Sequence, residues 1–449
     1  MRIARMAKLL ASLAFAVAGC SERALDPSRG QLALDKGFAP GLTAGGDCGG
    51  LPTQPDSVRV DLYDPSFSHP LNADNPLFPV GDLDRVVLLG NVEGEPLRVE
   101  TTKMHGTRTV EIKGQEVETI ISQYVAWLGG RIHEVAIDLY AQDDEGAVWY
   151  FGEDVFNYED GEVADTEGTW LAGQDGPVAM IMPANPEVGD AWRPENACPL
   201  VFEEVTATQT GVTVAGPRGP VAGALIVTEL HMDGSTEGKT FAPGYGEFST
   251  GAKTDLEAVA VAVPIDALHG REPDELDVLS DGAERIFEEA RRGRWRDLAA
   301  IADRMDDAWD AYQATGVPPM LDDQMTGALE ALEEAIDGHD KNETRQASIN
   351  VSLASVDFEL RYDDRSEIDL DLIEIWTRQL VLDMHTHDRG GVLGDIATLN
   401  VIRDRLTESE RGLIEANLRA LKSAAQSGNP AAVEEIATQL TAAISRIAS

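Results

Sequence analysis

The stretch that decides the fold is residues 94–131, GEPLRVETTKMHGTRTVEIKGQEVETIISQYVAWLGGR. Leu97, Val99 and Thr101 alternate with charged residues, and a period of two is typical of a strand with one buried face. Lys113-Gly114 and Gly129-Gly130 interrupt the pattern, and glycine supplies the positive φ that a tight hairpin requires. The stretch therefore predicts antiparallel strands joined by hairpins.

The same pattern extends in both directions, over residues 56–265. Turn signals such as Glu93-Gly94 and Asp160-Gly161 recur about every eight to twelve residues. Val58, Val60 and Leu62 alternate in the same way and predict a further strand near the start. A meander of this length predicts an antiparallel β-sandwich or a curled half-barrel.

After Pro264 the apolar period changes from two to 3.6. Leu298, Ile301 and Met305 share one helical face, and glycine-bearing breaks punctuate the rest of the chain. We expect about seven or eight helices, arranged as helical hairpins in an all-α bundle over residues 272–449. The chain is thus predicted to be a multidomain α+β protein.

Composition excludes one class of partner. The 449 residues are 43% hydrophobic, enough to bury large cores, and contain 79 Asp plus Glu against 36 Lys plus Arg, a formal charge of −43. A nucleic-acid site needs clustered basic residues to displace counterions, so no nucleic acid is expected. The acidity is interpreted as a solvated surface, with weak divalent-cation binding as the alternative.

The N-terminus carries an export signal. Arg2, Arg5 and Lys8 precede the apolar run Leu9–Gly19, which is too short to span a bilayer, so residues 1–19 are interpreted as a signal peptide. The run ends in Val17-Ala18-Gly19-Cys20, which resembles the lipobox of bacterial lipoproteins.

That resemblance implies cleavage before Cys20, followed by S-lipidation and N-acylation of this residue. The acyl chains would then attach the protein to a membrane of the cell envelope, and Ser21 resembles the signal for the outer membrane. Residues 20–55, rich in glycine and proline, are interpreted as a flexible tether. The alternative is an ordinary secretory peptide with a chance cysteine.

Two further cysteines, Cys48 and Cys198, remain for other chemistry. An exported chain meets an oxidising compartment, so we expect these two to form a disulfide. Free buried thiols are the alternative.

Residues 148–192, with FAPGYGEF at 241–248, resemble a family of β-rich secreted proteins and lipoproteins in bacteria. The likeness covers residues 75–250 and implies a β-rich fold and export, but no catalytic residues. Trp149, Tyr150, Trp170 and Trp192 are interpreted as core and edge-covering aromatics, rather than as a ligand platform.

Two segments resemble known functional motifs but lack the residue spacing that those motifs require. Gly234 to Thr240 resembles a phosphate-binding loop, but it is one residue short and runs into Phe241-Ala242-Pro243, so a hairpin turn is expected. His133-Glu134 begins like a zinc-protease motif, but position 137 is Ile. No cofactor is expected.

The metal-ligand candidates are Asp383, His385, His387 and Asp388 at the end of one helix, with His339 at an analogous turn. If both turns lie at one end of the bundle, their imidazoles and carboxylates could meet at a transition metal. The alternative is a solvated polar turn, because residues two apart point to different sides of a helix.

The leading hypothesis for function is a membrane-anchored envelope lipoprotein with a non-enzymatic binding or scaffolding role. Its ligand, and any envelope protein partner, are unidentified. One alternative is an extracytoplasmic hydrolase that uses carboxylates such as Glu153, Asp154 or Asp138, and another is metal binding by the helical domain. A carboxylate with a raised pKa deep in a pocket would favour the enzyme.

Overall fold

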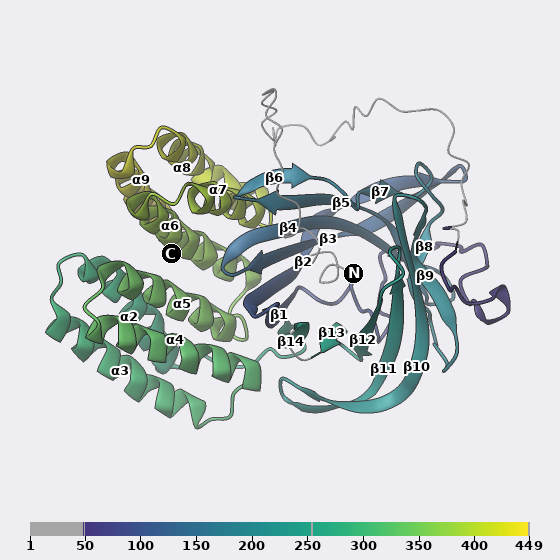
Figure 1. Ribbon diagram of the computed structural model, residues 1–449, viewed down its shortest axis with the longest axis horizontal. Coiled ribbons are helices and arrows are strands. Elements are labelled where there is room, and N and C mark those ends of the chain that lie inside the picture. Colours follow the sequence, from purple (N-terminus) through teal and green to yellow (C-terminus); the bar gives the residue numbers. More distant parts are fainter. Residues whose placement is uncertain (1–47, 49, 253–254, 448–449) are drawn as a thin grey trace.

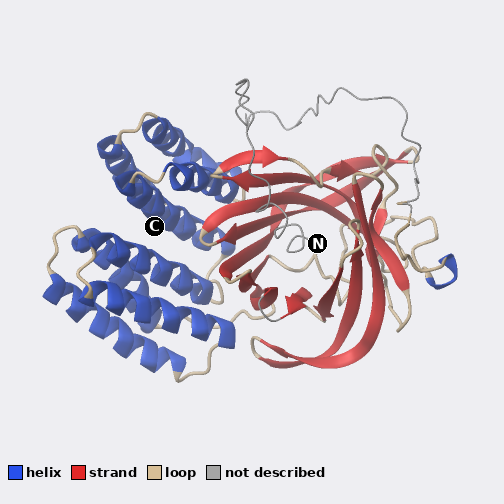
Figure 2. Ribbon diagram, viewed as in Figure 1, coloured by secondary structure: helices blue, strands red, loops and turns tan. Residues whose placement is uncertain are grey.

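The computed structural model describes residue 48, residues 50–252 and residues 255–447. The predicted signal peptide, Cys20 and most of the predicted tether lie outside these residues. Within the described part, a 14-stranded antiparallel sheet is followed by helices (Figure 2). The predicted fold class, a curled β region followed by a helical bundle, is confirmed.

The strands occupy the first part of the described chain, after a short 3₁₀ helix, η1 (Asp56–Val58). They are β1 (Arg85–Val92), β2 (Glu95–Ile112), β3 (Gln115–Leu128), β4 (Arg131–Gln142), β5 (Val148–Glu159), β6 (Glu162–Asp165), β7 (Trp170–Leu171), β8 (Ala179–Met182), β9 (Ala191–Ala197), β10 (Val201–Gly216), β11 (Gly219–His231), β12 (Thr236–Ala242), β13 (Gly246–Ala252) and β14 (Asp255–Val263).

The sheet consists of two meanders joined at its centre. Its order is β6-β5-β4-β3-β2-β1-β14-β13-β12-β11-β10-β9, with β7 and β8 pairing with β5. The first and last strands of the region, β1 and β14, therefore lie side by side and pair Arg85 with Val263. The sheet curls around a hollow without closing, so it has a concave and a convex face (Figure 1).

The predicted hairpins form as the sequence indicates. In the turns at Glu93-Gly94, Lys113-Gly114 and Asp160-Gly161, both central residues have positive φ, between 51° and 89°. This is the geometry of the type I′ turn, whose twist matches that of the flanking strands. These turns set the register of β1 with β2, β2 with β3, and β5 with β6.

The predicted strand at Val58–Leu62 is wrong. This segment forms only an isolated bridge, Arg59 with Ala191, and the Leu62 side chain is exposed. Alternation makes a segment suitable for a sheet, but a strand also needs a partner along its length. Here the chain meets the sheet at one residue and then moves away.

Eight helices follow in the described chain, in agreement with the expected number. They are α2 (Asp274–Ala290), α3 (Trp295–Gln313), α4 (Pro319–Asp337), α5 (Lys341–Glu359), α6 (Arg365–Thr386), α7 (Arg389–Arg403), α8 (Glu408–Gln426) and α9 (Pro430–Ile444).

Local signals explain most helix boundaries. Thr407 and Glu410 form a capping box at the start of α8, and Asp340 accepts hydrogen bonds from two backbone N–H groups at the start of α5. The break between α5 and α6, at residues 360–364, contains no glycine or proline and was not expected. A tertiary contact accompanies it, since the backbone N–H of Leu268 donates to the Arg361 carbonyl at 2.6 Å.

The helices pack against the convex face of the first meander (Figure 1). Trp127 of β3 stacks on Trp376 of α6 with ring centroids 5.8 Å apart, and its indole N–H donates to Thr398 of α7. Val87 and Val125 belong to the same apolar cluster as the helix interiors. One continuous core therefore joins the sheet to the bundle.

Buried ion pairs cross this interface. Arg85 pairs with Asp369, and the guanidinium of Arg405 pairs with Glu100. Arg98 holds Asp357 of α5 at 2.6 Å and Glu100 at 2.7 Å. Buried charges are stable only when paired, so these contacts fix how the helices sit on the sheet.

Cys48 and Cys198 form a disulfide-capable pair, with Cα atoms 5.7 Å apart. The backbone N–H of Gln54 donates to Glu204 of β10 at 2.5 Å, so the end of the predicted tether lies along the second meander. Among the described residues, no helix combines the length and apolarity that a bilayer crossing requires.

Candidate functional site

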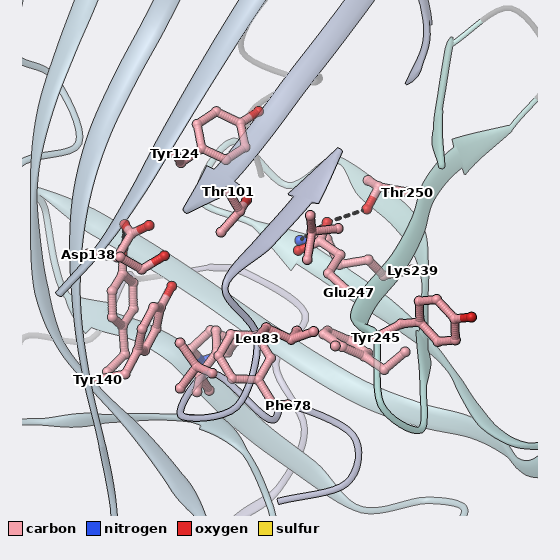
Figure 3. Close-up of a pocket in the computed structure, with 18 of the residues that line it drawn as sticks. Phe78, Leu83, Thr101, Tyr124, Asp138, Tyr140, Lys239, Tyr245, Glu247 and Thr250 are labelled. Atoms are coloured by element: carbon pink, nitrogen blue, oxygen red, sulfur yellow. Dashed lines mark hydrogen bonds and ion pairs between the residues drawn. The ribbon is translucent and has the colours of Figure 1, made fainter. Parts of the chain in front are cut away.

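A cavity of about 150 Å³ lies in the concave side of the curled sheet. Figure 3 shows its surroundings. Strands of the first meander contribute Asp138 and Tyr140, strands of the second contribute Lys239 and Glu247, and the loop before β1 contributes Phe78. The two halves of the sheet thus face each other across the cavity.

Strand register explains why polar side chains gather here. Glu203 of β10 lies directly opposite His231 of β11, and Glu229 of β11 lies directly opposite Glu237 of β12. Side chains alternate between the faces of a strand, so Glu203 and Glu229 share the concave face with apolar residues two positions away. The curl then directs all of them inward.

The wall that the second meander forms is rich in carboxylates, and Asp138 adds one more from the first meander. The residues that line the cavity include six carboxyl groups but only two lysines, Lys103 and Lys239. The acidic residues are Asp138, Glu195, Glu203, Glu229, Glu247 and Glu257. The site is therefore strongly electronegative.

Lys239 is the main counter-charge in this wall. Its ammonium lies 2.9 Å from Glu229 and 3.6 Å from Glu247. Burial alone would lower the pKa of Lys239, but the surrounding carboxylates outweigh burial and raise it. Lys239 stays charged, and it in turn lowers the pKa of Glu229 against the opposing effect of burial.

Glu203 behaves differently from its neighbour. Burial, followed by the nearby charge of Glu229, raises the pKa of Glu203. The two carboxyl groups therefore have pKa values pushed in opposite directions. Glu203 is therefore more easily protonated than Glu229.

The imidazole of His231 lies between carboxylates on both sides. Its Nδ1 is 3.2 Å from Glu203 Oε1, and its Nε2 is 3.8 Å from Glu237 Oε2. Nε2 is buried and makes no hydrogen bond. Glu203, Glu229 and His231 each place one potential ligand atom within 4.8 Å of the others, which no other trio of His, Cys, Asp or Glu does in the described chain.

The opposite wall is aromatic. Tyr140 and Tyr150 stack with ring centroids 4.9 Å apart, and Phe78 meets Tyr140 edge to face at 5.2 Å. The Tyr150 hydroxyl donates to Asp138 at 2.6 Å. Trp149, Trp170 and Trp192 are buried in the core behind this wall, as predicted.

The metal candidates from the bundle have other partners. Asp383 and Asp388 are both paired with Arg131 of β4, and Asp388 also caps α7. His385 Nε2 lies 2.6 Å from Glu434, and His387 ends α6 with a φ of 60°.

His339 packs edge to face on Trp295 with ring centroids 4.9 Å apart. The structure therefore does not gather these predicted ligands around one point.

Two of the proposed catalytic carboxylates, Asp138 and Glu153, lie on adjacent strands, whereas Asp154 has an arginine partner. Asp154 pairs with Arg108 at 2.9 Å, and Glu153 is buried opposite Asp138 in the strand register. Of the three, Asp138 lines the cavity.

Sequence reasoning missed Glu203, Glu229, His231 and Lys239. A signal was available, because these charged residues occupy the alternate positions at which Val205, Val227 and Phe241 face the interior. Charged residues at the buried positions of a strand point to a polar cavity.

Comparison with known proteins adds no family. No protein-family model matches the sequence, and no curated protein matches it.

Proposed function

We propose that this protein is a lipid-anchored protein of the cell envelope, of the outer membrane in a two-membrane cell, that binds a small organic cation in the cavity of its curled sheet. The observation that carries the ligand class is the excess of carboxylates over lysines around a partly aromatic cavity. The lipobox at Cys20 supports the anchor, and the cysteine pair supports an oxidising compartment.

Charge favours a cation. Buried carboxylates lose hydration, and that loss is offset only by counter-charges and hydrogen bonds. Six carboxyl groups and two lysines line the cavity. This excess of acidic groups would attract a bound cation, whereas an anion would be repelled.

Size and shape favour a compact, partly apolar ligand. A cavity of about 150 Å³ is the size that accommodates a benzene-sized molecule. Tyr140 and Tyr150 line the cavity, and aromatic rings attract ammonium groups. The expected ligand is therefore an amine of about six to ten non-hydrogen atoms.

A matched set of probes tests this proposal. Isothermal titration of the full chain in detergent would use benzylamine, benzyl alcohol and benzoate, which share a ring and differ in charge. We expect heat for benzylamine alone. Failure of benzylamine to bind, or equal binding of benzyl alcohol, would overturn the cation site.

A variant pair locates the binding. Glu257→Gln removes one lining carboxylate without changing its shape, and should weaken benzylamine about tenfold, the value of one charge-assisted hydrogen bond. Glu162→Gln on β6, which is exposed, is the control and should bind as the wild type does.

The anchor has its own test. Cys20→Ala should move the protein from the membrane fraction to the aqueous fraction, because the acyl chains would have no attachment site. Unchanged membrane fractionation would refute the anchor and leave the cation site unaffected.

A second candidate function is acid–base catalysis. It is favoured by the Glu203–Glu229 pair, whose pKa values are raised and lowered respectively, as in a general acid beside a base or nucleophile. A panel of nitrophenyl glycosides and esters would test it. Turnover that disappears in Glu203→Gln would support an enzyme, and absence of turnover across the panel would leave the binding role.

A further inference from the structure

The side chains around His231 form a compact set of nitrogen and oxygen ligands. Glu203 comes from β10, and Glu229 and His231 lie two residues apart on β11 and so share a face. All three are buried. Ligand groups held on adjacent strands of one sheet have little freedom to move, which favours a defined coordination geometry.

We propose that Glu203, Glu229 and Nδ1 of His231 bind a divalent transition-metal ion such as Zn²⁺, with Glu237 orienting the imidazole through Nε2. This inference goes beyond the cation-binding function and stands independently of it. An organic cation would use the whole electronegative cavity, whereas the metal requires these three ligand atoms.

The distances fit a metal of this kind. Zinc binds imidazole nitrogen and carboxylate oxygen at about 2.0–2.2 Å, so two such ligands of a tetrahedral ion lie about 3.4 Å apart. Nδ1 of His231 and Oε1 of Glu203 are 3.2 Å apart. Glu229 completes the trio, in which one potential ligand atom from each residue lies within 4.8 Å of the other two.

The second nitrogen of His231 supports the same assignment. A histidine that binds a metal through one nitrogen carries its proton on the other, and that N–H is usually directed at a carboxylate. Nε2 is buried without a hydrogen bond and faces Glu237 at 3.8 Å. In the metal-bound form this contact shortens to a hydrogen bond.

Lys239 is the group that competes with the metal. Its ammonium contacts Glu229 at 2.9 Å and lies 3.6 Å from Glu247. When the metal takes Glu229, Lys239 can shift fully onto Glu247. Removing the ammonium with Lys239→Met should therefore strengthen metal binding.

The test is titration of the EDTA-treated full chain, in detergent, with Zn²⁺ by calorimetry and with Co²⁺ by visible absorption. We expect one ion per chain. Glu203→Gln and His231→Ala should each weaken Zn²⁺ about 100-fold, and Glu237→Gln about 10-fold. His385→Ala, which changes a histidine far along the chain on α6, should leave the affinity unchanged.

Two results would overturn the site. One is the absence of stoichiometric binding by the wild type. The other is wild-type affinity in both Glu203→Gln and His231→Ala, with circular dichroism showing that both are folded. Because Glu203→Gln preserves size and shape, it keeps the test decisive if His231→Ala does not fold.

Discussion

The strongest prediction on stability concerns Arg405, which follows α7 and is buried against the sheet. Its guanidinium pairs with Glu100, donates to Gln123 at 2.6 Å and lies 3.6 Å from Asp369. Arg405→Met keeps an unbranched apolar stem but removes the guanidinium, its charge and these contacts. Glu100 and Asp369 would then remain buried with one fewer counter-charge.

The expected loss is about 3 kcal/mol. Breaking one side of a buried ion pair costs about 3–5 kcal/mol, because the remaining charge is left in a poorly solvated site. The lower end of this energy range applies to Arg405. Glu100 keeps its contacts with Arg98, at 2.7 Å, and Asp369 keeps Arg85.

Equilibrium urea unfolding at pH 7 measures this loss. Fluorescence of the seven tryptophans, which include the stacked Trp127 and Trp376 at the interface, reports on tertiary packing, and far-ultraviolet circular dichroism reports on the helices. Coincident transitions from the two probes would show that sheet and bundle unfold together, as their continuous core predicts.

The control is Arg419→Met on α8. Its partner is Glu415, one helical turn away at 3.2 Å, and Arg419 is 70% exposed. An exposed pair of this kind contributes about 0.5 kcal/mol or less. A loss below about 1 kcal/mol for Arg405→Met, similar to that of the control, would refute the idea that buried pairs hold the bundle on the sheet.

Three further changes test other parts of the structure. Cys198→Ser should lower the free energy of unfolding in urea by at most about 5 kcal/mol, the value for a cross-link spanning 150 residues. Dithiothreitol should reproduce this loss in the wild type only, and a wild type insensitive to the reductant would contradict the disulfide. Gly391→Ala should lower the free energy of unfolding by about 1–3 kcal/mol, because a methyl group there would lie 1.9 Å from both Arg131 Nη1 and Asp383 Oδ2. The control Gly412→Ala in α8 meets no atom within 4 Å and should be stabilising or neutral. Equal effects of the two variants in thermal or urea unfolding would count against the packing argument. Burial and then Asp371 raise the pKa of Glu359, so the folded state holds a proton that the unfolded state loses above the usual pKa of 4.5, and stability falls as pH rises through the raised pKa. Glu359→Gln should therefore stabilise the protein more at pH 8 than at pH 5.5. A difference in urea midpoint that does not depend on pH would argue against this.

The opposite pH dependence applies at the interface. Burial by itself favours protonated Glu100, but Arg405 and then Arg98 outweigh it and lower the pKa of Glu100. The stability that this carboxylate contributes is present above its unfolded value of 4.5 and is lost as pH falls through the depressed pKa. The Glu359 contribution to stability is therefore lost as pH rises, and the Glu100 contribution is lost as pH falls.

The sequence by itself determined the local structure of this protein. The change from period two to period 3.6 after Pro264 separates strands from helices, and turns such as Lys113-Gly114 set the hairpins. Both follow from interactions between residues close along the chain, which a single sequence displays directly. Where such local signals are absent, as between α5 and α6, the sequence analysis missed the boundary.

Only the tertiary structure decided where the candidate site lies. The alternation in β10 and β11 puts Glu203, Glu229 and His231 on one face, but it does not say that this face is concave. That depends on the pairing of β1 with β14, strands about 170 residues apart, and on the curl that brings the aromatic strands opposite. A long-range contact also engages His385, which meets Glu434 of α9, whereas His387 ends α6 in a left-handed conformation. Contacts between distant segments depend on the whole fold, so no local pattern specifies them.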